Sequence, residues 1–257
     1  MSSLLEKISR RLSPPRPPER FPGAMDSYPT MILSIDHHAP PPRRLLELSM
    51  AAVRCVTDEV NLDHLKARPN VPDWFTIWPG EHYLLLAAIV KILQPKVVIE
   101  VGTDSGLSAL CMKHYLPADG KIVTYDLLPW QTVQEPDFEE ADFADGRLEQ
   151  RLADLADAET FERNRELIAS AEFMFIDGPK NVTFENALMR HLATVKFSKP
   201  PILMFDDTRL PSMLKFWREL SYPKLDFTSF GHWSGTGLVE LVGGIRAGMR
   251  EPGSVTS

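Results

Sequence analysis

Three acidic side chains and a lysine follow two apolar stretches in the second half of the chain. Asp177 and Lys180 come after the first stretch, and Asp206 and Asp207 come after the second. The carboxyl ends of parallel strands meet at one edge of a sheet, so we expect the three carboxylates to converge. Close carboxylates shift their pKa values, pair with cations or bind a hard ion such as Mg²⁺, Mn²⁺ or Ca²⁺. The alternative is that the two later acids cap the following helix while the lysine is a solvated neighbour.

A glycine motif follows the most regular apolar stretch of the sequence. Residues 97–108 read VVIEVGTDSGLS and contain Glu100-x-Gly102-x-x-x-Gly106. Glycines at a strand-to-helix turn let the backbone approach a ligand, and the helix N-terminus offers N–H groups to an anion. The G-x-G-x-x-G pattern of dinucleotide enzymes is absent. The motif therefore predicts a nucleotide-like cofactor and disfavours an NAD-dependent oxidoreductase.

Two further acids follow the next expected strands. Asp126 ends the stretch 121–126 and stands 20 residues after Gly106. An acid at this distance can accept hydrogen bonds from both ribose hydroxyls of a cofactor; a strand-end turn is the alternative. Asp154 is expected near the adenine, with a helix N-cap as an equal alternative.

The E-x-G-x-x-x-G motif resembles the first motif of class I S-adenosylmethionine (SAM) methyltransferases. Residues 78–242 resemble the metal-dependent small-molecule O-methyltransferases, such as the catechol and caffeoyl-CoA enzymes. They also resemble the macrolide and aminocoumarin sugar O-methyltransferases and the cephalosporin hydroxylase-like proteins. The resemblance implies that the glycines face the methionine part of SAM, with Glu100 at its ammonium group and Ser108 at its carboxylate. The full expected cofactor set is Glu100, Gly102, Asp104, Gly106, Ser108, Asp126, Asp154 and Asp177.

In the catechol group, an Asp after the fourth strand and an Asp-Asn pair after the fifth bind Mg²⁺. These positions match Asp177, Asp206 and Asp207, and the lysine that acts there as a base matches Lys180. Asp207 replaces the Asn, which adds negative charge. Asp104 stands where the catechol enzymes carry an aromatic residue, and Gly178-Pro179 replaces bulkier residues, so the substrate wall differs.

A lysine can accept the proton of a substrate hydroxyl only if its own pKa is lowered. His232, between two glycines near the end of the chain, is a second candidate base or a substrate contact, although a histidine in a hairpin loop is more often structural. Trp74, Trp78 and His82 precede the glycine motif and could cover the cofactor or pack in the core.

Apolar periodicity predicts an α/β protein with a doubly wound, Rossmann-like seven-stranded sheet, mostly parallel and closed by an antiparallel C-terminal hairpin. The expected strands are 97–101, 121–126, 147–152, 172–177, 201–206, 225–230 and 237–242. The expected helices are 43–60, 81–93, 106–115, 159–169, 182–195 and 211–219.

The same patterns divide the chain into a proline-rich arm (1–42), an N-terminal helical cap (43–93), the methyltransferase core (94–245) and a tail (246–257). The arm carries the segments Pro14-Pro-Arg-Pro-Pro and Pro40-Pro-Pro, which favour polyproline conformations. It is expected to be either a flexible arm, or a lid or oligomer arm that lies over the active site, so a homo-oligomer is a possible assembly.

The composition of the chain limits which classes of binding partner and which cellular compartment are expected. The formal net charge of −7 argues against a nucleic-acid partner. The two cysteines lie far apart, which fits a reducing cytoplasm. No apolar run is long enough to span a bilayer, and the first residues lack a signal-peptide pattern.

Together these patterns predict a SAM-dependent O-methyltransferase that acts on a hydroxyl of a small molecule, a secondary-metabolite phenol or sugar, with help from Mg²⁺ or a similar divalent cation. Two alternatives stay open. One is a metal-independent O- or N-methyltransferase with Lys180 or His232 as base. The other is a non-catalytic SAM-binding module that uses the arm for assembly.

Overall fold

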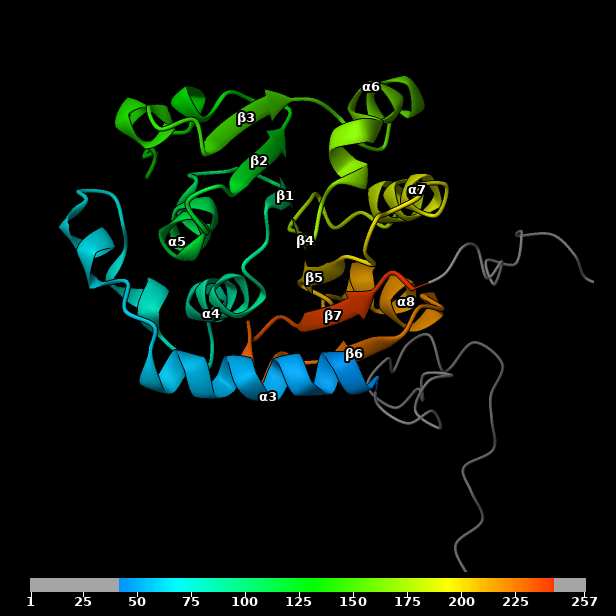
Figure 1. The fold of residues 1–257 in the computed structure, drawn as a ribbon, viewed down its shortest axis with the longest axis horizontal. Helices are drawn as coiled ribbons and strands as arrows, with labels where there is room; N and C mark the ends of the chain where they lie inside the picture. The colour runs from blue at the N-terminus through cyan, green and yellow to red at the C-terminus, as the bar shows by residue number, and fades with distance from the viewer. Residues whose placement is uncertain (1–41, 243–257) are drawn as a thin grey trace, which may run out of the picture. The chain divides into compact units, whose positions relative to one another are not determined.

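The computed structural model describes residues 42–242 (Figure 1). The predicted proline-rich arm, apart from its last residue, and the predicted tail lie outside this range. The structure of residues 42–242 does not test the predicted domain boundaries, which stay predictions.

A seven-stranded sheet forms the centre of the described region, with strand order β3-β2-β1-β4-β5-β7-β6. Strands β1 to β5 are parallel, and β7 is antiparallel to both β5 and β6. The predicted fold class is therefore confirmed. The strands are β1 (Val97–Val101), β2 (Lys121–Asp126), β3 (Leu148–Leu152), β4 (Phe173–Ile176), β5 (Ile202–Asp206), β6 (Lys224–Asp226) and β7 (Thr236–Glu240).

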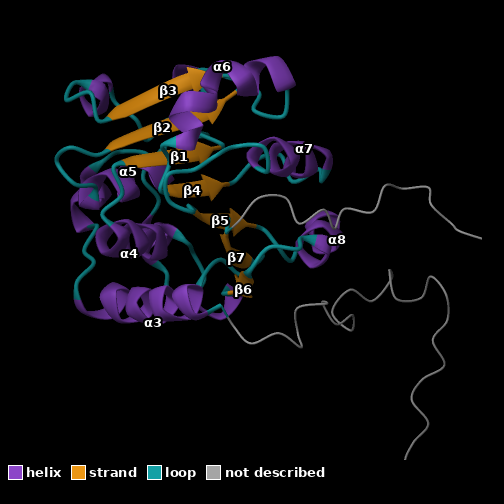
Figure 2. Ribbon diagram, turned by 45° about the vertical axis from the view of Figure 1, so that its right-hand side comes forward, coloured by secondary structure: helices purple, strands orange, loops and turns teal. Residues whose placement is uncertain are grey.

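Helices cover both faces of the sheet (Figure 2). One buried apolar cluster joins α3, α4 and α5 to one face, and a second joins α6, α7 and α8 to the other. The central strands are buried on both faces, which explains why their sequences are continuously apolar rather than alternating. The helices are α3 (Arg43–Asp58), α4 (Tyr83–Leu93), α5 (Leu107–Tyr115), α6 (Ala158–Ala169), α7 (Thr183–Leu192) and α8 (Pro211–Glu219). Short 3₁₀ helices lie at Asp63–Ala67, Asp73–Thr76, Trp130–Thr132, Glu140–Phe143 and Thr228–Phe230.

Helix α3 packs along α4 and beside the β6–β7 edge (Figure 1). Arg44 at its start donates to Glu240 on β7 at 2.6 Å and to the Pro200 carbonyl at 3.0 Å. None of the helices within residues 42–242 is both long and apolar enough to cross a membrane.

The terminal hairpin differs from the prediction. The expected strand 225–230 ends at Asp226, where the Asp226 carboxylate accepts the Thr228 N–H at 3.0 Å. Residues Thr228–Phe230 then form a 3₁₀ turn. The apolar side chains after Asp226 look like a strand in sequence, but the aspartate turns the backbone out of the ladder.

Candidate active site

The three predicted carboxylates converge at the carboxyl edge of β4 and β5. Asp177, Asp206 and Asp207 each bring a carboxylate oxygen within 4.8 Å of the others. Asp206 is almost fully buried, while the Asp177 side chain is 25 % exposed, so the cluster reaches the surface on one side. The predicted convergence is confirmed, because parallel strand ends bring residues distant in sequence to one place.

Two basic side chains pair with these acids. Lys180 Nζ lies 2.6 Å from Asp177 Oδ1 and 2.9 Å from Asp207 Oδ2. His232 Nδ1 lies 3.2 Å from Asp206 Oδ2 and 3.6 Å from Asp207 Oδ1. The two predicted bases therefore both reach the carboxylates, and neither is a remote surface residue.

The charges within the cluster determine which groups hold protons. Burial lowers the pKa of Lys180, but the carboxylates of Asp177 and Asp207 outweigh it and raise the pKa above its usual value. Burial likewise lowers the pKa of His232, and hydrogen bonds to Asp206 and Asp207 then raise it to about 10. Lys180 could act as a base only with a lowered pKa. In this arrangement the pKa is raised, because two carboxylates stabilise the ammonium form of Lys180.

A backbone contact brings a second histidine into the site. The segment before α4 pairs with the β6–β7 connection: Gly80 N–H donates to the Gly231 carbonyl, and Trp233 N–H donates to the Gly80 carbonyl, both at 3.1 Å. Trp78 Nε1 adds a hydrogen bond to the Phe230 carbonyl at 2.8 Å. This pairing sets Glu81 and His82 beside His232.

His82 is buried in the site and packs its ring against Phe175 on β4. Its Nδ1 lies 3.6 Å from Asp206 Oδ2. Burial lowers the pKa of His82 to about 4, so its ring is neutral near pH 7. From the sequence, His82 was expected only to be a residue that could cover the cofactor or pack in the core. The one available signal was a histidine placed just before a helix that leads into the first core strand.

The loops at this edge carry strained backbone. Asp104, Lys180, Val182 and Asp207 all have positive φ, between 43° and 69°, in the loops after β1, β4 and β5. Such angles are costly for residues with a side chain, above all for a β-branched valine, and they concentrate at functional sites. The Lys180 loop is held by Glu185, which accepts the Lys180 N–H at 3.0 Å.

The glycine motif lies beside this cluster, after β1. Gly102 has φ +95°, and a side chain there would collide with the Asp177 backbone carbonyl. Gly106 has φ +94°, and a side chain would collide with the Phe138 ring. Both glycines are thus required by contacts within the protein, and the predicted approach of a cofactor to them stays a prediction.

Asp126 ends β2 as predicted, and its carboxylate accepts backbone N–H groups. Oδ2 accepts from Thr103 at 2.9 Å and Asp104 at 3.3 Å, and Oδ1 accepts from Leu127 at 2.7 Å and Leu128 at 3.2 Å. The acid therefore joins the glycine loop to the end of β2. Any ribose bound there shares the carboxylate with these donors.

Glu100 and Ser108 contact each other. Ser108 Oγ donates to Glu100 Oε1 at 2.5 Å, and Glu100 is fully buried. Burial raises the pKa of Glu100 to about 8. Ser108 was expected to donate to a cofactor's carboxylate, and in this structure its hydroxyl donates to Glu100 instead. Glu100 Oε2 is buried without a hydrogen-bond partner.

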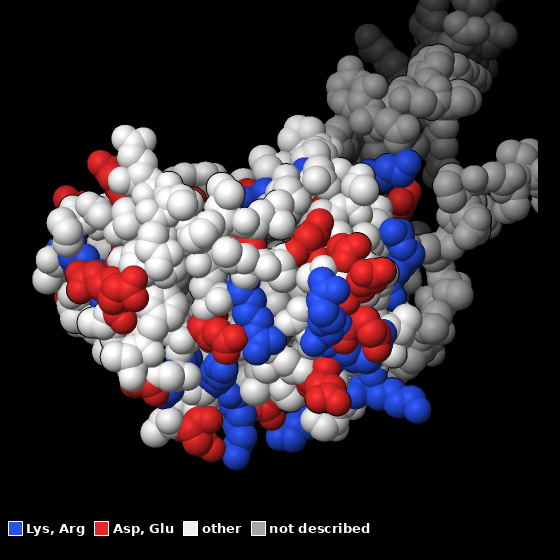
Figure 3. All heavy atoms as spheres, turned by 90° about the horizontal axis from the view of Figure 1, so that it is seen from above, with Lys and Arg blue, Asp and Glu red and all other residues white. Residues whose placement is uncertain are grey.

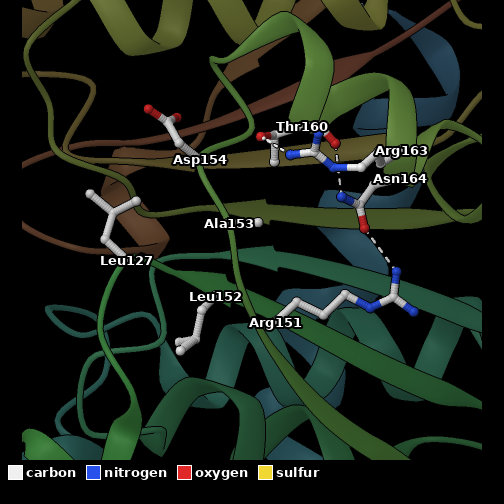
Figure 4. A pocket seen from close by; sticks show the side chains of 8 residues that line it. All are labelled: Leu127, Arg151, Leu152, Ala153, Asp154, Thr160, Arg163 and Asn164. Atoms are coloured by element: carbon white, nitrogen blue, oxygen red, sulfur yellow. Dashed lines mark hydrogen bonds between the residues drawn. The ribbon is translucent and has the colours of Figure 1, made fainter.

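Asp154 lines a cavity of about 390 Å³ between the end of β3 and α6 (Figure 4). Its carboxylate accepts the Ala156 N–H at 2.8 Å, while Asp157 is the N-cap of α6 and accepts from Thr160. The N-cap alternative for Asp154 is therefore wrong, because the N-cap of α6 lies three residues later, at Asp157. None of the side chains that line this cavity belongs to the carboxylate cluster.

The seven-stranded order with its antiparallel β7, and an acidic cluster beyond the parallel strands, define a Rossmann-like fold of the methyltransferase type. The sequence profile of the O-methyltransferase family matches residues 74–209, more than half of the chain. The chain therefore belongs to the O-methyltransferase family, and the prediction of a methyltransferase is confirmed. Among curated proteins, none matches this sequence.

Solved structures of methyltransferases are similar in fold. The methyltransferase PaMTH1 of Podospora anserina, bound to S-adenosylhomocysteine (SAH), has 14% identity and a TM-score of 0.52, over 78% of this chain and 97% of its own. An O-methyltransferase from Bacillus cereus in complex with SAH has 16% identity and a TM-score of 0.44, over 84% and 96%. TomG of Streptomyces achromogenes, an O-methyltransferase of tomaymycin synthesis in complex with SAM, has 15% identity and a TM-score of 0.44, over 86% and 96%.

Proposed function

We propose that this protein transfers the methyl group of SAM to a hydroxyl of an aromatic small molecule, assisted by a divalent cation held by Asp177, Asp206 and Asp207. The observation that carries this proposal is the convergence of three carboxylates, a lysine and two histidines next to the glycine motif. The family supports O-methyl transfer. The identity of the methyl acceptor, the use of a cation and the residues that bind each of them go beyond what the family supports and are proposals.

Several residues fit SAM. SAM supplies an electrophilic methyl group on a sulfonium. Glu100 has a buried oxygen without a hydrogen-bond partner, which could accept from an ammonium group. Leu127, Leu128 and Leu152, at the ends of β2 and β3, are more than half exposed and offer an apolar surface to an adenine ring. PaMTH1, with the same fold, holds SAH.

The carboxylate cluster fits a divalent cation. Within the described residues, four carboxyl groups (those of Glu81, Asp177, Asp206 and Asp207) face only two charged basic groups. Asp206 Oδ1 is buried without a hydrogen-bond partner. When bound, a divalent cation would lower the pKa of the acceptor hydroxyl and orient its oxygen.

Lys180 is the proposed proton acceptor. Its Nζ lies between Asp177 and Asp207, at the exposed side of the cluster. Lys180 can take up the hydroxyl proton only when these two carboxylates are engaged elsewhere, because they otherwise keep its ammonium form. Asp206 and Glu185 orient the site: Asp206 holds His232, and Glu185 holds the backbone of the Lys180 loop.

The rim of the cluster favours an aromatic acceptor over a sugar. Trp233 is 64 % exposed and its ring lies 5.1 Å from that of His232. Ile77 is 51 % exposed on the paired segment, and Phe230 stacks on Trp78. Flat apolar surfaces of this kind suit a ring that carries the hydroxyl. Acidic and basic side chains are interspersed on the face shown in Figure 3.

A metal-independent reaction is the second candidate. The contacts of Lys180 and His232 with all three carboxylates favour it, because the acids then already have cationic partners. Turnover in EDTA separates the two candidates: we expect EDTA to abolish it, and undiminished turnover would support the metal-independent reaction.

The proposal is tested by SAH calorimetry and by methyl transfer to a panel of phenols. We expect SAH binding and transfer to at least one phenolic hydroxyl, and absence of SAH binding would overturn the proposal. Lys180→Arg keeps the charge but removes the basic site, so we expect a loss of about 10²-fold in kcat with SAH affinity retained. Full activity of that variant would exclude Lys180 as the base.

A further inference from the structure

We propose that His82, Asp206 and His232 form a cation position of their own, beside the oxygen-only position, and that it selects a transition metal over Mg²⁺. This inference rests on the proposed function for its role in turnover. Cation binding itself can be measured without SAM or acceptor. Asp206 is common to both positions, so the two lie next to each other.

The distances suit one ion. The ligand atoms of His82, Asp206 and His232 all lie within 4.8 Å of one another. Asp206 Oδ2 lies 3.6 Å from His82 Nδ1 and 3.2 Å from His232 Nδ1. Ligand atoms about 2.1 Å from one ion are about 3.0 to 3.4 Å apart at octahedral or tetrahedral angles. Small side-chain movements would bring these atoms into coordination, provided that His232 Nδ1 gives up its 2.5 Å contact with Ser234 Oγ and its proton to the incoming ion.

His82 supplies an independent observation. Its side chain is 6 % exposed, and its Nδ1 is buried without a hydrogen-bond partner. A buried polar nitrogen without a partner is costly unless something binds it. This nitrogen faces Asp206, whose Oδ1 is also buried without a hydrogen bond.

Glu81 supports the orientation of His232. Glu81 Oε2 lies 3.9 Å from His232 Nε2, on the side of the ring opposite Nδ1. Histidines that bind metal through one nitrogen commonly direct the other to a carboxylate, which fixes the ring. The pairing of Gly80 with residues 231–233 holds Glu81 in this place.

The ligand set determines the preferred ion. Two imidazoles and one carboxylate suit first-row transition metals, whereas Mg²⁺ prefers oxygen ligands only. We therefore expect Co²⁺, used as a spectroscopic probe, to bind the metal-stripped protein at least about 100-fold more tightly than Mg²⁺.

The experiment combines X-ray absorption of the Co²⁺-loaded wild-type protein with titrations of Co²⁺ and Mg²⁺ into variants. We expect imidazole scattering in the wild type. His82→Gln should weaken Co²⁺ binding at least about tenfold and leave Mg²⁺ binding within about twofold. The matched control is His64→Gln, an exposed histidine outside the site, and it should change neither.

Oxygen-only scattering, or unchanged Co²⁺ affinity in a folded His82→Gln variant, would overturn the inference. If that variant does not fold, the wild-type spectrum decides alone. If methyl transfer occurs while Co²⁺ is coordinated by oxygen atoms alone, this inference is overturned and the proposed function stands. If Co²⁺ is coordinated by imidazole but no methyl transfer occurs, the inference stands and the proposed function is overturned.

Discussion

The two halves of the carboxyl edge hold their acids in different ways. At the end of β2, Asp126 accepts backbone N–H groups from two loops. At the ends of β4 and β5, Asp177 and Asp207 share the side chain of Lys180. Backbone donors are fixed by the fold, whereas a lysine can turn away. The first half is therefore built to hold loops in place, and the second half can exchange its partners for a ligand.

The largest expected effect lies where the two halves touch. Gly102→Ala puts a side chain against the Asp177 backbone at φ +95°, so we expect a loss of about 4 kcal/mol in the free energy of unfolding. Gly146→Ala is the matched control: φ is +70°, but the space is open, and we expect a loss of about 1 kcal/mol. Urea unfolding measures both, and equal losses would mean that the two halves do not press on each other here.

The second prediction concerns the exchangeable half. Asp206→Ala removes the acid common to both histidines, and we expect kcat to fall by about 10²-fold or more. SAH affinity should stay within about threefold, because Asp177 is the only one of the expected cofactor residues that lies in the same half as Asp206. Steady-state kinetics and calorimetry test this, and a parallel loss of SAH binding would show that the halves act as one.

The third prediction uses the buried acid of the first half. Burial raises the pKa of Glu100 from 4.5 to about 8. A raised acid pKa contributes stability that is complete below pH 4.5 and is lost as pH rises to about 8. Glu100→Gln should remove this loss, so its free energy of unfolding should fall less steeply than that of the wild type between about pH 5 and about pH 8. Unfolding curves from pH 5 to about 9 test it, and parallel profiles would contradict it.

The smallest effect is expected at Asp126. Asp126→Asn replaces one acceptor oxygen with an amide that cannot accept, which should cost about 1 kcal/mol in the free energy of unfolding. If the acid also binds ribose, SAH affinity falls by a further factor of about ten. Unchanged SAH affinity would restrict Asp126 to holding the loops together.

The sequence was sufficient where one element decides the outcome. Continuous apolar runs predicted β1 and β2 with their observed bounds, 97–101 and 121–126. The convergence of Asp177 and Asp206 followed from strand direction alone. The end of β6 was missed because Asp226 binds the Thr228 N–H, and a local turn of this kind overrides apolar character.

Tertiary pairing explains the other differences. His82 joins the site only because Gly80 pairs with the β6–β7 connection, a contact that no local pattern encodes. A positive φ is disfavoured for a β-branched valine, so the φ of Val182 is imposed by the structure around it and not by its own preference. Ser108 was expected to bind a ligand, but Glu100 competes for its hydroxyl from across the strand-to-helix turn.

The pairing of residues 78–82 with 230–233 has a consequence for synthesis. Trp78 meets Phe230 across 152 positions of the chain. During translation, β1 to β5 can all emerge before the partner of Glu81 and His82 exists. A nascent or truncated chain that stops before residue 230 could therefore build the parallel sheet while its reaction centre is still incomplete, so methyl transfer would begin only after the last hairpin has formed.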